Sequence, residues 1–173
     1  MITLVIGGIR SGKSQLGARL VTRHGGAVTV IAPTRVPDDP DLAARVRDHQ
    51  QRRPAAWTTV ECGPGLPAAL AGADGPALVD SLGTWVAQTP DFAVDPSELL
   101  DVLSRRAAPT VLVTEEVGLS VHPPTRSGLR FADALGSLNA AVAGIADEVL
   151  LAVAGRVVRL DPLEGGAGTG SGP

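Results

Sequence analysis

The sequence predicts a single α/β domain with a mostly parallel sheet covered by helices on both faces. Three observations support this fold class. Short runs rich in Val, Leu, Ile and Ala alternate along the chain with segments of helical character. Most of these runs are continuously apolar, which is typical of parallel strands buried on both faces. The first run leads through a glycine-rich turn into a helix, as in the units from which such sheets are built.

Seven strands are expected from the apolar runs. They lie at 2–6, 27–32, 57–61, 77–80, 110–114, 148–154 and 157–160. Gly155 separates the last two runs by a short turn. This pair therefore predicts an antiparallel hairpin at the edge of the sheet.

Helices are expected between the strands, with ends marked by glycine, proline and capping residues. They lie at 15–21, 40–53, within 63–75, and at 82–88, 96–107 and 126–146. Asp39 is the expected N-cap of the second helix, with Pro40 in its first turn, and Pro54 ends it. The remaining segments at 33–40, 91–96 and 118–125 are expected to be loops.

Length and composition limit the classes of protein that fit. We expect residues 1–163 to form one domain and the tail at 164–173, almost all Gly, Ala, Ser and Thr, to be disordered. The formal net charge of −3 argues against a nucleic-acid-binding surface. The single cysteine, Cys62, fits a reducing cytoplasm and has no histidine nearby in sequence to activate it, which favours a structural role. No apolar run approaches the ~20 residues that span a bilayer, and the chain opens with a strand rather than a signal peptide.

The turn after the first strand carries a phosphate-binding motif. Its residues are Gly7, Gly8, Ile9, Arg10, Ser11, Gly12, Lys13 and Ser14. A strand, this Gly-x-x-x-x-Gly-Lys-Ser spacing and a helix together define a P-loop, whose backbone N–H groups and helix N-terminus bind phosphate. Lys13 is the only lysine among 15 lysines and arginines, so a compact cation is used where the loop requires one. The motif predicts that Lys13 binds the outer phosphates of a nucleotide and that Ser14 binds Mg²⁺.

Acidic residues follow two of the expected strands. Asp80 ends an apolar strand, where a carboxylate in a P-loop protein binds Mg²⁺ directly or through water. The alternative is that Asp80 caps the following helix. Glu115 and Glu116 follow the fifth expected strand. Either could support the metal site from behind its direct ligands or act as a general base. Adjacent side chains on an extended chain point in opposite directions, so at most one of them should face the site.

His49 lies on an expected helix, on the same face as Leu42 and Val46. A histidine on such a face is commonly a hydrogen-bonded structural residue. Its neighbours favour a second interpretation, because a cationic cluster binds polyphosphate and keeps the imidazole neutral and nucleophilic. Attack of that imidazole on phosphorus would give a phosphoramidate. The cluster consists of Arg45, Arg47, Arg52 and Arg53.

These motifs resemble those of the bifunctional adenosylcobinamide kinase / adenosylcobinamide-phosphate guanylyltransferases of cobalamin biosynthesis. The resemblance runs from Met1 to about Leu160, begins at the P-loop and continues through 42–46 to His49. Its later matches are Arg53-Pro54, Trp57, Glu61-Cys62, 78–82, 113–118, Phe131, Asp133, Gly136, Asn139 and 146–149.

The resemblance implies two reactions. A nucleoside triphosphate, ATP or GTP, phosphorylates the aminopropanol hydroxyl of adenosylcobinamide. GTP then transfers GMP to the enzyme with release of pyrophosphate, and GMP passes to adenosylcobinamide phosphate to form adenosylcobinamide-GDP. By position, His49 is the guanylylated residue. The other positions that match nucleotide contacts are Pro33, Thr34, Arg35, Gln50, Gln51, Arg52, Arg53, Glu61 and Asp80. The family fold is a P-loop α/β domain, usually a homotrimer.

The sequence departs from the family pattern at several positions. Ser81 replaces a usual cysteine, Gly83 a frequent threonine and Glu115 a common asparagine. The other departures are Pro33, Ser120, Leu129 and Ala132. The last two affect expected contacts to the corrinoid or a neighbouring subunit, which leaves guanylylation better supported than kinase activity.

Two other function classes fit the residues without the resemblance. One is a P-loop kinase of another small alcohol, in which His49 is structural. The other is a nucleotide-dependent switch or assembly ATPase, since related folds do mechanical work. A covalent GMP on His49 would exclude both.

Overall fold

The computed structural model describes residues 1–34, 54, 56–119 and 123–163. Within them the chain forms a seven-stranded sheet of order β3-β2-β4-β5-β1-β6-β7. The strands are β1 (Ile2–Gly7), β2 (Thr29–Ala32), β3 (Thr58–Glu61), β4 (Ala77–Asp80), β5 (Thr110–Glu115), β6 (Glu148–Val153) and β7 (Arg156–Leu160). Every neighbouring pair is parallel except β6–β7, which is antiparallel. The expected α/β class and edge hairpin are confirmed.

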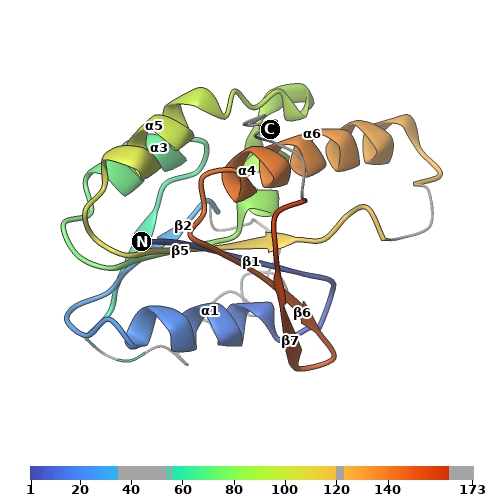
Figure 1. Ribbon diagram of the computed structural model, residues 1–173. Coiled ribbons are helices and arrows are strands. Elements are labelled where there is room, and N and C mark those ends of the chain that lie inside the picture. Colours follow the sequence, from blue (N-terminus) through green and yellow to red (C-terminus); the bar gives the residue numbers. More distant parts are fainter. Residues whose placement is uncertain (35–53, 55, 120–122, 164–173) are drawn as a thin grey trace, which may run out of the picture.

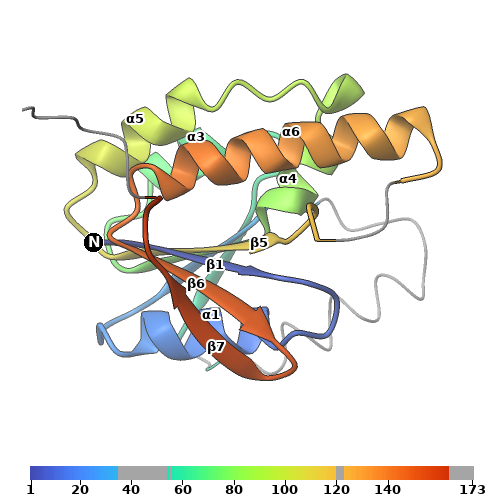
Figure 2. The same cartoon turned by 45° about the vertical axis from the view of Figure 1, so that its right-hand side comes forward.

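Within the described residues, the helices cover the two faces of the sheet unequally. They are α1 (Lys13–Thr22), α3 (Leu66–Ala71), α4 (Leu82–Gln88), α5 (Ser97–Arg105) and α6 (Arg126–Ala143), with a 3-10 turn η1 (Pro90–Phe92). Helix α1 lies on one face, and α3, α4, α5 and α6 lie on the other (Figures 1 and 2). The helix expected over 40–53 lies outside the described residues.

The limits of some elements differ from the expected ones. Helix α1 begins at Lys13, two residues early, because the P-loop itself leads into its first turn. Helix α6 ends at Ala143 rather than at 146, and η1 lies in part of the expected loop at 91–96. No helix in the described part of the chain has both the length and the apolarity needed to cross a membrane.

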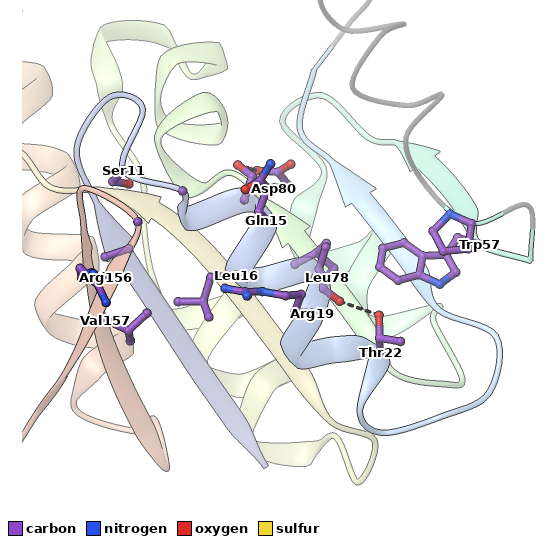
Figure 3. Close-up of a pocket in the computed structure, with 16 residues that line it drawn as sticks. Ser11, Gln15, Leu16, Arg19, Thr22, Trp57, Leu78, Asp80, Arg156 and Val157 are labelled. Carbon is purple, nitrogen blue, oxygen red and sulfur yellow. Dashed lines mark hydrogen bonds between the residues drawn. The ribbon is translucent and has the colours of Figure 1, made fainter.

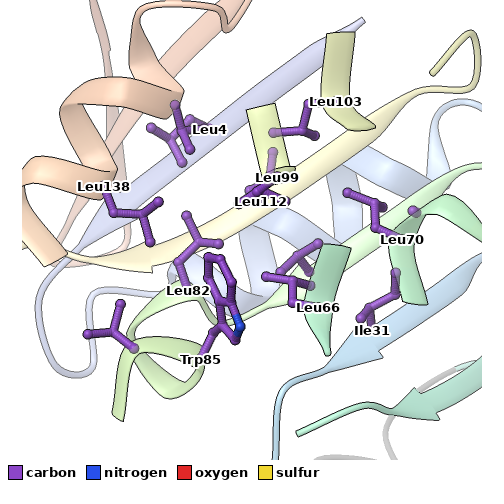
Figure 4. Close-up of a cluster of buried hydrophobic side chains, with 14 of the residues drawn as sticks. Leu4, Ile31, Leu66, Leu70, Leu82, Trp85, Leu99, Leu103, Leu112 and Leu138 are labelled. Carbon is purple, nitrogen blue, oxygen red and sulfur yellow. The ribbon is translucent and has the colours of Figure 1, made fainter. Parts of the chain in front are cut away.

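Alternate residues along the central strands supply two separate cores, as strand geometry requires. Leu4, Ile31, Val79 and Leu112 face the four-helix side and pack against leucines of α3 to α6 and against Trp85 (Figure 4). On the other side of the sheet, strand residues pack against Leu16 and Val21 of α1. These strand residues are Val5, Val30, Leu78, Val111 and Val113. The continuous apolar runs of the sequence therefore reflect burial of both strand faces.

Candidate functional site

The P-loop connects β1 to α1 in a tight backbone turn. Arg10 and Gly12 have φ angles of 56° and 92°, in the left-handed region that glycine adopts most readily. Gly7 leaves no room for a side chain, since a Cβ there would lie 2.7 Å from the carbonyl oxygen of Ala152. The turn between β6 and β7 supports the loop, because the Gly155 N–H donates to the Ser11 carbonyl at 3.0 Å. This support was not predicted from the sequence.

Lys13 turns back over the loop. Its Nζ donates to the carbonyl of Gly8 at 3.3 Å and lies 3.7 Å from Oε1 of Glu115. Because parallel strands end at one edge, the end of β5 brings Glu115 beside the P-loop strand β1. The lysine is therefore held at the mouth of the loop by a backbone acceptor and a carboxylate.

Ser14 and Asp80 also meet at this edge. The Ser14 hydroxyl donates to Oδ1 of Asp80 at 3.3 Å, although β5 separates β4 from β1 in the sheet. Ser81, rather than Asp80, caps α4, since its hydroxyl oxygen accepts from the Thr84 N–H at 3.2 Å. The capping alternative for Asp80 is therefore wrong. Asp80 instead presents an oxygen beside the hydroxyl of the P-loop serine.

The two adjacent glutamates point in different directions, as expected. Glu115 reaches Lys13 and also accepts a hydrogen bond from the Ser81 hydroxyl at 3.1 Å. Glu116 folds back onto its own loop and accepts from the N–H groups of Gly118 at 2.6 Å and Leu119 at 2.9 Å. Only Glu115 is directed toward the P-loop lysine.

A pocket of about 600 Å³ adjoins the P-loop on the α1 side of the sheet (Figure 3). Ser11, Ser14 and Asp80 line it, and of these Ser14 and Asp80 are the predicted metal ligands. The structure adds three residues that the sequence did not single out as contacts, namely Arg19 of α1, Trp57 before β3 and Arg156 of β7. The volume is within the usual range of small-molecule sites.

The other predicted contact residues fall into two groups. Pro33 and Thr34 follow β2, and Glu61 ends β3, so all three lie at the same edge as the P-loop. With neighbouring strands about 4.8 Å apart, the four steps from β3 to β1 place Glu61 roughly 19 Å from the P-loop strand, too far to share its phosphates. The second group lies outside the described residues: Arg35, His49, Gln50, Gln51, Arg52 and Arg53.

Cys62 lies just after β3, with its thiol 3.8 Å from the Ala32 carbonyl and 3.7 Å from that of Gly63. Burial raises the pKa of this thiol, and a backbone hydrogen bond only partly opposes the rise. A thiol with a raised pKa is mostly protonated at pH 8 and therefore a poor nucleophile. This environment agrees with the structural role expected from the sequence.

We expect Cys62 in the native protein to react with iodoacetamide at pH 8 roughly tenfold more slowly than in the urea-unfolded chain. The native rate should rise with pH, with a midpoint above that of the unfolded thiol, because the raised pKa delays thiolate formation. Alkylation followed by mass spectrometry between pH 7 and 10 measures both midpoints. A native midpoint below the unfolded one would contradict this environment.

The chain is similar to known proteins over nearly its whole length. A family model described as cobinamide kinase / cobinamide phosphate guanyltransferase matches residues 3–160. A bifunctional adenosylcobalamin biosynthesis protein, CobP of Pseudomonas aeruginosa, is 36% identical over 165 residues, which cover 90% of this chain and 94% of that protein. CobU of Salmonella typhimurium, with the same description, is 34% identical over 183 residues and covers 92% and 99% of the two chains.

Among solved structures, the flagellar accessory protein FlaH of Methanocaldococcus jannaschii has a TM-score of 0.48 and 11% identity, covering 90% of this chain and 74% of FlaH. The KaiC-like protein PH0186 of Pyrococcus horikoshii has a TM-score of 0.49 and 14% identity, and the match covers 87% of this chain and 71% of PH0186. The match to the family model spans nearly the whole chain, from the P-loop to the final strand. The chain therefore belongs to the cobinamide kinase / cobinamide phosphate guanylyltransferase family, enzymes of cobalamin biosynthesis.

Proposed function

We propose that the P-loop, residues 7–14, holds the triphosphate of the nucleotide and that Lys13 binds its outer phosphates. Ser14 and Asp80 would hold Mg²⁺. The observation that carries this proposal is the 3.3 Å contact between the Ser14 hydroxyl and the Asp80 carboxylate, next to Lys13. Hydroxyl and carboxylate oxygens fit Mg²⁺, which is usually bound by few protein ligands together with water and phosphate oxygens. Bound there, the ion would neutralise negative charge on the terminal phosphates.

The first proposed reaction is phosphorylation of adenosylcobinamide by ATP or GTP. The oxygen of the aminopropanol hydroxyl attacks the γ-phosphorus and loses its proton to solvent. The bond to the β–γ bridging oxygen breaks, and the nucleoside diphosphate leaves. Lys13 and the backbone N–H groups of the P-loop hold the phosphates in line for this attack. The geometry of the loop supports these roles, because Gly12 has a φ of 92° and Lys13 lies in the first turn of α1.

The second proposed reaction proceeds through His49. A ring nitrogen attacks the α-phosphorus of GTP, pyrophosphate leaves, and a P–N bond holds GMP on the protein. A phosphate oxygen of adenosylcobinamide phosphate then attacks the same phosphorus, and the P–N bond breaks. We assign the remaining nucleotide contacts to Pro33, Thr34, Arg35, 50–53 and Glu61, as the resemblance implies. We further propose that the protein is a cytoplasmic homotrimer.

Incubation with Mg²⁺ and GTP labelled at the α-phosphate tests the covalent step. We expect label on the denatured protein that survives alkali and is lost in acid, as a histidine phosphoramidate would be. The variant His49→Ala should lose all label but keep GTP binding, because the P-loop is unchanged. His24→Ala is the matched control, since His24 is exposed at the end of α1 and should leave labelling unaltered. If the folded wild-type protein binds GTP but carries no label, the covalent step is contradicted and a kinase without a guanylylated histidine remains.

A further inference from the structure

Glu115 occupies a central position at the carboxyl edge of the sheet. It ends β5, which lies between β1 with its P-loop and β4 with Asp80. Its Oε1 is 3.7 Å from Lys13 Nζ, and its Oε2 accepts from the Ser81 hydroxyl. We propose that Glu115 is an internal counter-anion of Lys13, which the terminal phosphates must displace, and that it makes triphosphate binding depend on a divalent cation. This inference rests on the proposed role of the P-loop.

The carboxylate of Glu115 sits in a space that Gly83 leaves open. A Cβ at Gly83, in the first turn of α4, would overlap Oε2 of Glu115, so any larger residue would displace the carboxylate. Gly83 and the Glu115 carboxylate therefore lie side by side, where α4 begins next to the end of β5. The small residue on α4 therefore provides room for the long acidic side chain on β5.

The backbone of Glu115 is also fixed. Its carbonyl accepts from Nδ2 of Asn139 at 3.0 Å, and the hydroxyl of Thr114 donates to Oδ1 of Asn139 at 2.7 Å. Thr114 is fully buried and Asn139 is 9% exposed, so these bonds tie the end of β5 to α6 in the protein interior. The Glu115 side chain thus starts from a well-defined position and reaches Lys13 without a loop rearrangement.

The pair is shielded enough for its charges to matter. The Lys13 side chain is 14% exposed and that of Glu115 is 32% exposed, so solvent screens them less than an open surface pair. A P-loop lysine serves the β- and γ-phosphates. A triphosphate that takes Lys13 must therefore break the pair and also place its own negative charge near the Glu115 carboxylate. Both effects oppose binding, and both vanish when Glu115 is neutral.

A divalent cation reduces the second of these costs. Ser14 and Asp80 would hold such a cation at the mouth of the P-loop. The cation would lower the effective negative charge of the terminal phosphates, so Glu115 would repel them less. Without the cation, the triphosphate meets the full charge of the carboxylate. Glu115 therefore weakens the binding of the metal-free nucleotide more than that of the metal complex, and so selects the form that the reaction uses.

The test is calorimetric titration of the full chain, in EDTA and in Mg²⁺, for wild type and Glu115→Gln. The ligand is GTP whose α–β bridging oxygen is replaced by a methylene group, so that the proposed transfer to His49 cannot consume it. Glutamine keeps the shape of the side chain and an oxygen acceptor for Ser81, and it replaces the charged oxygen beside Lys13 with a neutral amide NH₂ group. We expect Glu115→Gln to bind GTP roughly tenfold more tightly in EDTA and roughly threefold or less in Mg²⁺. Unchanged or weaker binding in EDTA would overturn the proposal, and an equal gain in both conditions would overturn its cation dependence.

Glu116→Gln is the matched control, because Glu116 is adjacent in sequence and turned away from Lys13. It should leave both affinities unchanged, and an equal gain there would mean a general charge effect and sink the proposal. Lys13 is the only lysine, so protein made with ¹³C-labelled lysine gives one Cε signal. That signal should shift in Glu115→Gln and stay in place in Glu116→Gln. A wild type that binds no GTP in Mg²⁺ would refute the proposed role of the P-loop. If the wild type binds GTP but Glu115→Gln does not bind it more tightly in EDTA, only the proposed role of Glu115 as a counter-anion is refuted.

Discussion

Lys13→Ala should abolish both phosphorylation and guanylyl transfer and weaken GTP binding by roughly 100-fold or more. The reason is local. Lys13 begins α1, and its ammonium lies at the mouth of the P-loop beside the Gly8 carbonyl, where the terminal phosphates are proposed to bind. Among the 15 lysines and arginines it is the only compact ammonium, so the loss of this contact has no substitute in kind.

The matched variant for this prediction is Lys13→Arg, which keeps the charge and changes its shape. A planar guanidinium cannot occupy the narrow turn as a point charge does, so we expect Lys13→Arg to recover only a small part of the binding. Calorimetry measures the affinity, and circular dichroism with thermal unfolding checks that each variant is folded. Retention of triphosphate use in Lys13→Ala would place the nucleotide site away from the P-loop.

The sequence predicted the strand pattern and the P-loop well because both depend on local residue order. Apolar runs define strands, and Gly7, Gly12 and Lys13 have a spacing that requires no knowledge of distant contacts. Ligands of parallel α/β sheets generally bind at the carboxyl ends of the strands. Asp80 and Glu115 could therefore be proposed as site residues because each lies at the end of an expected strand.

The remaining features depend on which elements become neighbours. The insertion of β5 between β1 and β4 brings Glu115 to Lys13, and no local pattern encodes that order. The same is true of Gly83, whose missing side chain matters only because α4 begins beside the end of β5. The turn at Gly155 also meets the P-loop only because β6 pairs with β1. Such contacts are set by the packing of the whole domain.

Arg106 is the clearest case of a residue that the sequence did not reveal. It follows α5, where an arginine would ordinarily be a solvated charge, yet its guanidinium turns back to the α3–β4 connection. It donates to the carbonyls of Leu70 at 2.7 Å and Gly75 at 2.8 Å, to that of Ala73, and to the Thr110 hydroxyl at 3.1 Å. Burial lowers the pKa of Arg106, and the nearby Asp74 partly opposes this. The side chain thus ties the end of α3 and its connection to β4 together, and the Leu70 carbonyl also accepts from the Ala73 N–H at 3.2 Å.

Arg106→Ala should therefore destabilise the domain by about 3 to 4 kcal/mol, because three carbonyls and a hydroxyl lose a charged donor at once. For a chain of this size the loss corresponds to a fall in Tm of roughly 10 °C. Arg106→Lys should recover little, since an ammonium cannot span the four acceptors as the planar fork does.

Arg105→Ala is the matched control for Arg106→Ala. Arg105 is the preceding residue, its side chain is 80% exposed, and its contact is an ion pair with Asp101 at 3.0 Å one turn away. An exposed pair of this kind contributes about 0.5 kcal/mol or less. Urea unfolding of the three variants measures the differences in unfolding free energy. Equal losses for Arg105→Ala and Arg106→Ala would mean that the loss reflects removal of an arginine at the end of α5, whereas a loss confined to position 106 would identify the bonds to the α3–β4 connection as its source.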